Sequence, residues 1–193
     1  MNETPRIWVG CLASYNAGTL HGEWMDADDG EDEVNDKIAA LLRSSPNPNV
    51  MIECPDCEGD SDGCKPCKGS GEVPSAEEFH ICDSENFLGY DVGRYSSIEQ
   101  VCKAAEMLVQ HGEAFGAACS AFCEDEVEQA LEERYRGVWD SVADYAAEYA
   151  EDCGVLADVP EQLKYCIDWD QYAAGMELTE VRVNGSVHIF DSC

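Results

Sequence analysis

A large excess of negative charge constrains the fold of this chain more than any other feature of its sequence. The 193 residues include 41 Asp and Glu but only 11 Lys and Arg, which gives a formal net charge of −30 at pH 7. Repulsion of this size destabilises a compact state. The acidic residues are spread through segments that also carry core residues, so we expect the folded surface itself to be acidic. A solubilising or halophilic surface and a surface that imitates a polyanion are both compatible with this charge.

The composition nevertheless supports a folded protein. Hydrophobic residues make up 45% of the chain and aromatic residues 9%, which argues against plain disorder. A chain of this length forms one ordinary domain or two to three small ones. No apolar stretch approaches the ~20 residues of a membrane helix. The N-terminus lacks a basic region followed by an apolar run, so we expect no secretory signal and a location in the cytoplasm.

The order of predicted strands and helices indicates an α+β fold. Strands are expected at 6–12, 19–25 and 78–82, with Leu20 and Trp24 on one face of the second. Helices follow, and a hairpin around Asn184-Gly185, a strong type I′ turn signal, closes the chain. Strands and helices that occupy separate stretches are typical of α+β proteins. We expect three small domains in a row: β-rich 1–95, central helical 96–137, and C-terminal 138–193 with helices plus the hairpin.

Helix signals divide the middle of the chain. Val34, Ile38, Leu41 and Leu42 share one side of a short helix, and the Ser96-x-x-Glu99 capping box opens another. That second helix is expected to end at His111-Gly112. Its predicted buried face contains Ile98, Val101, Cys102, Ala105, Leu108 and Val109. More helix is expected through Tyr135, then from about Val138 to Asp152, and a short helix from Pro160.

Acidic residues dominate the helices between 124 and 152, where eleven acids face only Arg134 and Arg136. Like charges four residues apart lie on one helix face at ~6 Å spacing and repel one another, so a sequence selected for stability alone would place lysines among them. This acidic helix face is either simply exposed to solvent, or its function is to present a negative electric field. The candidate carboxylates here are Glu124, Asp125, Glu128, Glu132, Asp140, Asp144, Glu148 and Asp152.

The amount of charge can be compared with that of DNA. Duplex DNA carries one charge per ~1.7 Å of its axis, so thirty charges correspond to ~50 Å of duplex. A compact sphere cannot arrange its charge as a rod. If the chain imitates DNA, we therefore expect it to be elongated.

Four cysteines form a second motif. Cys54, Cys57, Cys64 and Cys67 have the spacing C-x2-C-x6-C-x2-C, and two close thiolate pairs suit tetrahedral zinc. Disulfides or redox chemistry are the alternatives. Four Cys ligands leave no open position, so one structural Zn²⁺ is expected. The second pair, with its following glycines, resembles the cysteine-rich modules of DnaJ-type chaperones. The other eight cysteines are scattered, and most are expected to be small buried hydrophobes: Cys11, Cys82, Cys102, Cys119, Cys123, Cys153, Cys166 and Cys193.

No catalytic motif is present in the sequence. The phosphate-binding loop, G-x-S-x-G, G-x-G-x-x-G and H-E-x-x-H are all missing. The four histidines are expected to have surface or packing roles. Basic residues are too few for binding DNA through counterion release. We therefore expect neither an enzyme nor a protein that binds nucleic acid directly.

Several segments, taken in order, resemble the ArdA antirestriction family. Arg6-Ile7-Trp8-Val9-Gly10 is followed by Tyr15-Asn16-Ala17-Gly18 and Leu20-His21-Gly22-Glu23-Trp24. Further on come Glu78-Phe79-His80-Ile81-Cys82-Asp83 and Val159-Pro160-Glu161-Gln162-Leu163. Tyr165-Cys166-Ile167-Asp168-Trp169-Asp170 and Tyr172-Ala173 complete the set. The resemblance covers nearly the whole chain except 53–73.

This resemblance implies an elongated, three-part homodimer that imitates bent B-form DNA. It implies inhibition of type I restriction–modification enzymes, through occupation of the DNA-binding groove of their specificity and methyltransferase subunits. It adds Asp168 and Asp170 to the candidate carboxylates and places the dimer interface around 155–193. Mobile genetic elements carry such proteins into bacterial hosts. The chain departs from the family at Ala174-Gly175, where Arg-Asp is usual, and in the cysteine insert 53–73.

A different class of function remains open beside this one. A zinc-stabilised acidic adaptor or chaperone-like module could bind basic DNA-associated proteins. Competition with duplex DNA for a restriction–modification enzyme distinguishes the two, because an adaptor would not displace DNA.

Overall fold

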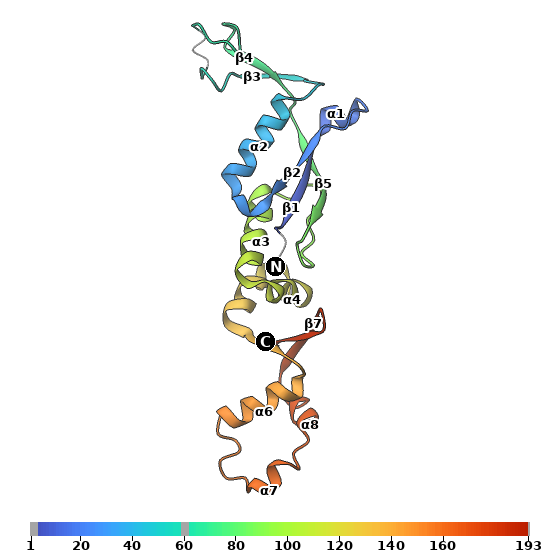
Figure 1. Cartoon of the computed structure of the whole chain (residues 1–193), viewed down its shortest axis with the longest axis vertical. Helices are drawn as coiled ribbons and strands as arrows, with labels where there is room; N and C mark the ends of the chain where they lie inside the picture. Colours follow the sequence, from blue (N-terminus) through green and yellow to red (C-terminus); the bar gives the residue numbers. More distant parts are fainter. Residues whose placement is uncertain (1–3, 59–61, 193) are drawn as a thin grey trace. The chain divides into compact units, whose positions relative to one another are not determined.

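A computed structural model describes residues 4–58 and 62–192, so Asp60 and Cys193 lie outside the described residues. It contains both helices and antiparallel strands (Figure 1), which confirms the predicted α+β class. The chain divides into two compact units. Unit 1 comprises 1–87 and 91–109, and unit 2 comprises 88–90 and 110–193. The arrangement of three domains with boundaries after 95 and 137 remains a prediction.

Unit 1 is built on a three-stranded antiparallel sheet with the order β2-β1-β5. These strands are β1 (Arg6–Cys11), β2 (Gly22–Asp26) and β5 (Phe79–Glu85). Side chains alternate between the two faces of a strand, and Ile7, Val9 and Met25 are fully buried on one face. Helix α2 (Glu31–Arg43) lies beside this sheet (Figure 1) and buries the predicted Val34, Ile38 and Leu41.

The second strand of unit 1 is shorter than predicted. A short helix, α1 (Leu12–Asn16), follows β1, and the Thr19 amide donates to the carbonyl of Ser14 at 2.9 Å. Residues 17–18 form a turn and 19–21 have no regular structure, so β2 begins only at Gly22. Leu20 is 81% exposed and lies outside the strand. The prediction that Leu20 and Trp24 share a strand face was therefore wrong.

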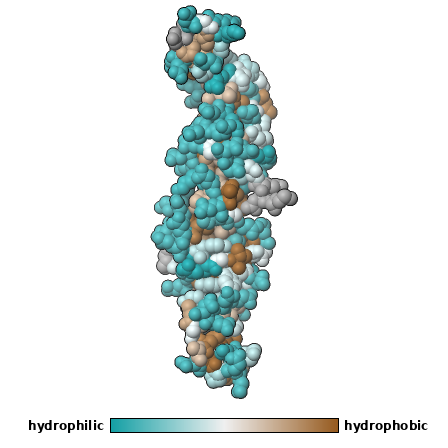
Figure 2. Space-filling model, turned by 60° about the vertical axis from the view of Figure 1, so that its left-hand side comes forward, coloured by the Kyte–Doolittle hydropathy of each residue, from teal (hydrophilic) through white to brown (hydrophobic). Residues whose placement is uncertain are grey.

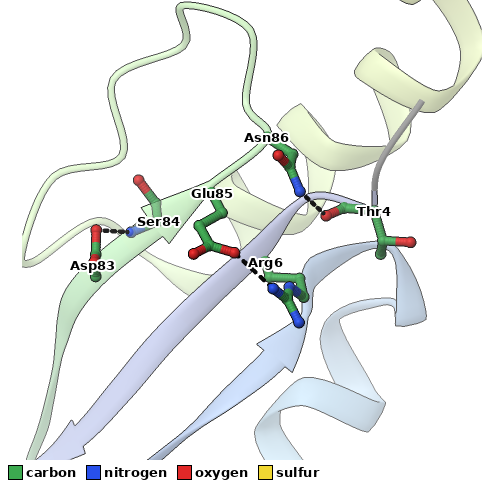
Figure 3. A network of polar contacts seen from close by, with 6 residues as sticks. All are labelled: Thr4, Arg6, Asp83, Ser84, Glu85 and Asn86. Atoms are coloured by element: carbon green, nitrogen blue, oxygen red, sulfur yellow. Dashed lines mark hydrogen bonds and ion pairs between the residues drawn. The ribbon is translucent and has the colours of Figure 1, made fainter. Parts of the chain in front are cut away.

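Polar contacts fasten the first strand to the end of β5 (Figure 3). The Arg6 guanidinium donates to Glu85 Oε2 at 2.6 Å, and Asn86 Nδ2 donates to the Thr4 carbonyl at 2.9 Å. Within β5, the Ser84 amide donates to Asp83 Oδ1 at 2.8 Å. An exposed ion pair of this kind adds little stability. It joins two residues that already face each other at the end of the β1–β5 ladder.

A two-stranded hairpin, β3 (Val50–Glu53) with β4 (Glu72–Ser75), carries the cysteine insert. After β5 the chain reaches α3 (Ile98–His111), which ends where the sequence predicts. Its first five predicted core residues are buried, but Val109 is 59% exposed, so that assignment was wrong.

The capping box of α3 lies one residue later than predicted. The Gln100 amide donates to Ser97 Oγ at 3.2 Å, and the Ser97 amide donates to Gln100 Oε1 at 3.4 Å. Ser96 Oγ instead accepts from the Gly93 amide at 3.0 Å. Gln satisfies the box as Glu does, so Ser97-x-x-Gln100 was an equally valid reading of the sequence.

Unit 2 starts with helical segments that are shorter than predicted. They are α4 (Glu113–Ala121), the 3-10 turn η2 (Glu124–Glu126), α5 (Val127–Gln129) and the π-helical turn η3 (Ala130–Arg134). Helix was predicted up to Tyr135 and again from about Val138, and both predictions were wrong here, because β6 (Tyr135–Trp139) is a strand.

Strand β6 exists because it has a partner elsewhere in the chain. Tyr135 pairs with Phe190 and Trp139 with Val187 on β8 (Ser186–Asp191). With β7 (Leu178–Val183) this gives a sheet of order β6-β8-β7. The predicted hairpin is confirmed: Asn184 and Gly185 both have positive φ, 49° and 93°, as a type I′ turn requires.

Helix α6 (Val142–Asp152) packs on this sheet. Ser141 caps it, and its first residue, Val142, lies four residues after the predicted start. Buried Tyr145 joins Val187 and Ile189 in a core covered by partly buried apolar side chains. Two short helices follow, α7 (Glu161–Lys164) after Pro160 as predicted, and α8 (Trp169–Ala173). No helix within 4–58 and 62–192 has the length and apolar content of a membrane span.

Candidate functional site

All ten candidate carboxylates lie in unit 2, and every one belongs to an exposed residue. They occupy the helical turns before β6, helix α6 with the turn before it, and the start of α8. Hydrophilic residues dominate the molecular face in Figure 2, with apolar residues in isolated patches. The ten are Glu124, Asp125, Glu128, Glu132, Asp140, Asp144, Glu148, Asp152, Asp168 and Asp170.

Helix α6 orders three of these carboxylates into a row. Asp144, Glu148 and Asp152 recur every four residues in this helix, so they share its exposed side at ~6 Å per step. The opposite side buries Tyr145, among other residues. Asp140 precedes the helix, so the regular series of four expected from the sequence holds over only three.

Three of the four basic residues of unit 2 form ion pairs with acids outside the ten. Arg136 pairs with Asp191, Lys164 with Glu161 at 3.0 Å, and Arg182 with Glu180 at 2.7 Å. Arg134 lies over the Phe122 ring, 5.6 Å from its centre. Glu128 aside, none of the ten carboxylates has an ion pair with a described residue. Their negative field is therefore left largely uncompensated.

Three of the ten carboxylates also accept hydrogen bonds from nearby groups and so stabilise the local structure. Asp168 Oδ1 accepts from the Gln171 amide at 3.0 Å and caps α8. Asp144 Oδ2 accepts from the Ser141 hydroxyl at 2.6 Å, beside the reciprocal cap of α6. Glu124 accepts from the Tyr90 hydroxyl at 3.3 Å. Acidic groups in a first helical turn also interact favourably with the helix dipole, so here surface charge and helix stability are compatible.

The four cysteines of the insert form one cluster in unit 1. Their sulfur atoms all lie within 4.8 Å of one another, with Cys54–Cys64 and Cys57–Cys67 Sγ distances of 3.7 Å. A disulfide needs sulfurs about 2.05 Å apart. A tetrahedral ion with metal–sulfur bonds of about 2.3 Å has sulfurs about 3.8 Å apart. The geometry fits a metal ion and not a pair of disulfides.

Backbone turns hold these cysteines together. The Cys54 amide donates to the Gly71 carbonyl at 2.9 Å, which closes the base of the loop, and the Glu58 amide donates to the Cys54 carbonyl at 2.8 Å. Glu58 and Lys68, each one residue after the second cysteine of a pair, have positive φ values that the sequence did not suggest. Burial opposes ionisation of Cys67, but hydrogen bonds from the Gly71 backbone and the Cys64 side chain outweigh it and lower its pKa to about 6.

The burial of the remaining cysteines and histidines agrees only in part with what the sequence predicts. Cys11 and Cys102 are buried as expected, but four of the scattered cysteines are exposed, so the expectation of burial was wrong for Cys82, Cys123, Cys153 and Cys166. Two histidines, His80 and His188, are almost fully buried, and one ring nitrogen of each has no hydrogen-bond partner in the described part of the chain. No sequence motif marked these two positions.

The two residues at which the chain departs from the ArdA pattern, Ala174 and Gly175, follow helix α8. Ala174 and Gly175 are both exposed, and the Gly175 amide donates to the Tyr172 carbonyl at 3.0 Å in a turn. Earlier in the chain, between α6 and α8, three large apolar side chains are exposed: Val155, Leu163 and Tyr165, at 51%, 55% and 84%. Residues 155–165 of unit 2 thus expose apolar side chains as well as polar ones.

The comparison with protein families matches a range that spans both units. Residues 7–188 match the family described as antirestriction protein (ArdA). The matched range includes all ten carboxylates and the cysteine cluster. No curated protein sequence matches the chain.

Proposed function

The chain belongs to the antirestriction protein (ArdA) family, and from this we propose that it inhibits type I restriction–modification enzymes by imitating DNA. The observation that carries the proposal is the exposed and largely uncompensated carboxylate surface of unit 2. A groove that binds duplex DNA is lined with Lys and Arg for phosphate contacts. Fixed carboxylates can satisfy those same cations. The specificity and methyltransferase subunits, in the bacterial cytoplasm, are the proposed partners.

The deciding experiment is competition. The full chain is titrated into a purified type I methyltransferase core that holds a fluorescent duplex containing its recognition site. We expect displacement of the DNA, and we expect the apparent affinity to fall steeply as salt is raised, because the contacts are between exposed charges. Binding of the chain to the enzyme while the duplex stays bound would support the adaptor alternative and contradict mimicry.

We further propose that the chain acts as a homodimer joined through 155–193. Exposed Val155, Leu163 and Tyr165 support this, since exposed large apolar side chains gathered in one segment are typical of association surfaces. The elongated shape and the matching length of DNA remain parts of the same proposal. Sedimentation and small-angle scattering test both, and a compact monomer at micromolar concentration would contradict them.

For the cysteine cluster we propose one structural Zn²⁺ held by Cys54, Cys57, Cys64 and Cys67. The all-sulfur donor set and the 3.7 Å sulfur separations support zinc, and four protein ligands exclude a position for substrate. When bound, the ion would supply no reaction chemistry and would brace the hairpin. Because four thiolates and Zn²⁺ together carry two negative charges, the centre would add to the acidic surface. The resemblance to DnaJ-type modules extends no further than this local arrangement.

A further inference from the structure

Unit 1 contains a pocket that the carboxylate surface and the cysteine cluster do not explain. It has a volume of about 410 Å³, within the range of ligand pockets. Strand β5, helix α1 and the loop that returns along β5 form its walls, and the Ile81 amide donates to the Arg94 carbonyl at 3.1 Å to hold that loop in place. Its lining includes Tyr15, His80, Cys82, Asp83, Val92 and Arg94.

Glycine at position 10 allows the side chains of this pocket to lie across the sheet. Gly10 pairs with His80 in the β1–β5 ladder. A Cβ atom at Gly10 would lie 2.7 Å from Cys82 Sγ and 3.7 Å from the His80 ring. Any other residue would therefore displace the Cys82 side chain, whereas the His80 ring would remain at an ordinary contact distance. The position of Cys82 in the pocket wall therefore depends on this glycine.

A buried polar group lines the pocket without a partner of its own. His80 is 2% exposed, and its Nδ1 has no hydrogen-bond partner in the described part of the chain. Buried polar atoms in native structures are normally paired, so such an atom requires an explanation. Tyr15 contacts the His80 ring edge-on, with ring centres 5.5 Å apart. Tyr15 is itself 58% exposed.

Arg94 gives the pocket a positive charge in a very acidic chain. Its guanidinium lies 5.9 Å from the ring centres of both Tyr15 and Tyr95. Within residues 4–58 and 62–192 it has no carboxylate partner. A guanidinium placed over aromatic rings keeps its N–H groups for a planar acceptor, which it can bind with two hydrogen bonds.

These features specify the kind of ligand. Arg94 matches one negative charge, whereas Asp83 at the same pocket would repel a second. Tyr15 and Val92 offer apolar surface for a flat body, and neutral His80 can donate or accept one hydrogen bond. We propose that this pocket binds a small carboxylate-bearing molecule, with its carboxylate on Arg94 and its body against Tyr15. This proposal does not depend on the antirestriction function.

Benzoate and benzamide provide a matched pair of probes, since they have the same shape and differ in charge. Each is titrated into the full chain while backbone amide signals are followed by NMR. We expect benzoate to shift the signals of His80, Cys82 and Arg94 saturably, and benzamide to bind at least tenfold more weakly. Equal binding of the two, or shifts that map outside the pocket, would overturn the proposal.

A charge-matched pair of variants tests the role of Arg94. The variant Arg94→Gln should bind benzoate at least tenfold more weakly, whereas Arg182→Gln in unit 2 should bind it as the wild type does. An equal loss in both would show a general charge effect and contradict the proposal. Short peptides with a free or an amidated C-terminus distinguish the source of the carboxylate. A preference of the free form over benzoate assigns the site to protein termini, and the reverse assigns it to small acids.

Discussion

The two units carry similar amounts of negative charge but use different means to fold under it. Unit 1 contains 22 acidic and seven basic residues, and unit 2 contains 19 and four. In unit 1 the segment with the fewest apolar residues is held by a cysteine cluster. In unit 2 the acidic helix α6 packs Tyr145 into a core with Val187 and Ile189, and the Trp139 ring lies edge-on to Tyr145. Each unit therefore combines its acidic surface with a local source of order, which is four clustered cysteines in the insert of unit 1 and apolar packing beneath α6 in unit 2.

The largest effect expected from this comparison concerns inhibition. Replacing Asp140, Asp144 and Glu148 together by their amides should weaken inhibition of a type I enzyme about tenfold, since small contributions from exposed charge contacts add up. Each single replacement should have little effect. Inhibition of DNA cleavage by a purified enzyme measures this, with circular dichroism to show that α6 remains helical.

A matched variant in unit 1 completes this test. Asp28, Asp32 and Asp36 are exposed and have no ion pair with a described residue, so their replacement by Asn removes the same charge. If the carboxylates of unit 2 carry the inhibition, this variant retains it. Equal losses in both variants would show that net charge, and not the surface of unit 2, is responsible. Loss of inhibition by one single replacement would indicate a localised site.

The next largest effect should come from metal removal, which we expect to change unit 1 and not unit 2. Protein purified under reducing conditions should contain about one equivalent of zinc, and a chelator should broaden the NMR signals of 54–71 alone. Unit 2 lacks such a cluster among its described residues, so its signals and the main melting transition should hardly change. Less than half an equivalent of metal would contradict the zinc proposal, and unfolding of all of unit 1 would contradict a peripheral role for the insert.

Lowering the pH should reduce the stability of both units, because each unit contains one buried histidine. Burial, aided by the Arg94 charge, lowers the pKa of His80; burial also lowers that of His188, against the opposing effect of Glu113. In the unfolded chain each histidine takes up its proton near pH 6.5. The stability due to each neutral ring is therefore complete above about pH 6.5 and is lost as the pH falls towards the folded pKa.

Because a cation faces His80 and a carboxylate faces His188, unit 1 should be the more acid-sensitive unit. Amide hydrogen exchange at pH 7.5 and 6, followed separately in the two units, measures this while carboxylates stay ionised. His80→Asn should reduce the pH dependence of hydrogen exchange in unit 1 alone. His188→Asn should reduce it in unit 2 alone. A steeper response in unit 2 would contradict this order.

The sequence was informative where local chemistry decides the structure. The Asn184-Gly185 hairpin, the buried side of α2 and the cysteine cluster all follow from short motifs whose physics is local. It failed at 135–139, because β6 exists only through pairing with a strand about fifty residues away. The pocket of unit 1 was missed for the same reason: Gly10, His80 and Arg94 meet only in the folded sheet.

The smallest expected effects come from the caps of the two longest well-capped helices, one in each unit. Ser97 caps α3 in unit 1 and Ser141 caps α6 in unit 2, each through its hydroxyl oxygen. Replacing either by Ala should cost about 1 kcal/mol in the free energy of unfolding of its unit, because one amide at the helix start loses its acceptor. Denaturant titration monitored in each unit measures the loss.

Ser96→Ala is the control that separates the observed cap from the one first expected. Its hydroxyl accepts from the Gly93 amide in the preceding loop, and α3 does not use it. The change should therefore leave the helicity of α3 intact and cost less than Ser97→Ala. A larger cost for Ser96→Ala would mean that the helix begins one residue earlier in solution. Equal costs for Ser97 and Ser141 would show that helix starts obey the same rule in both units, whatever stabilises the core beneath them.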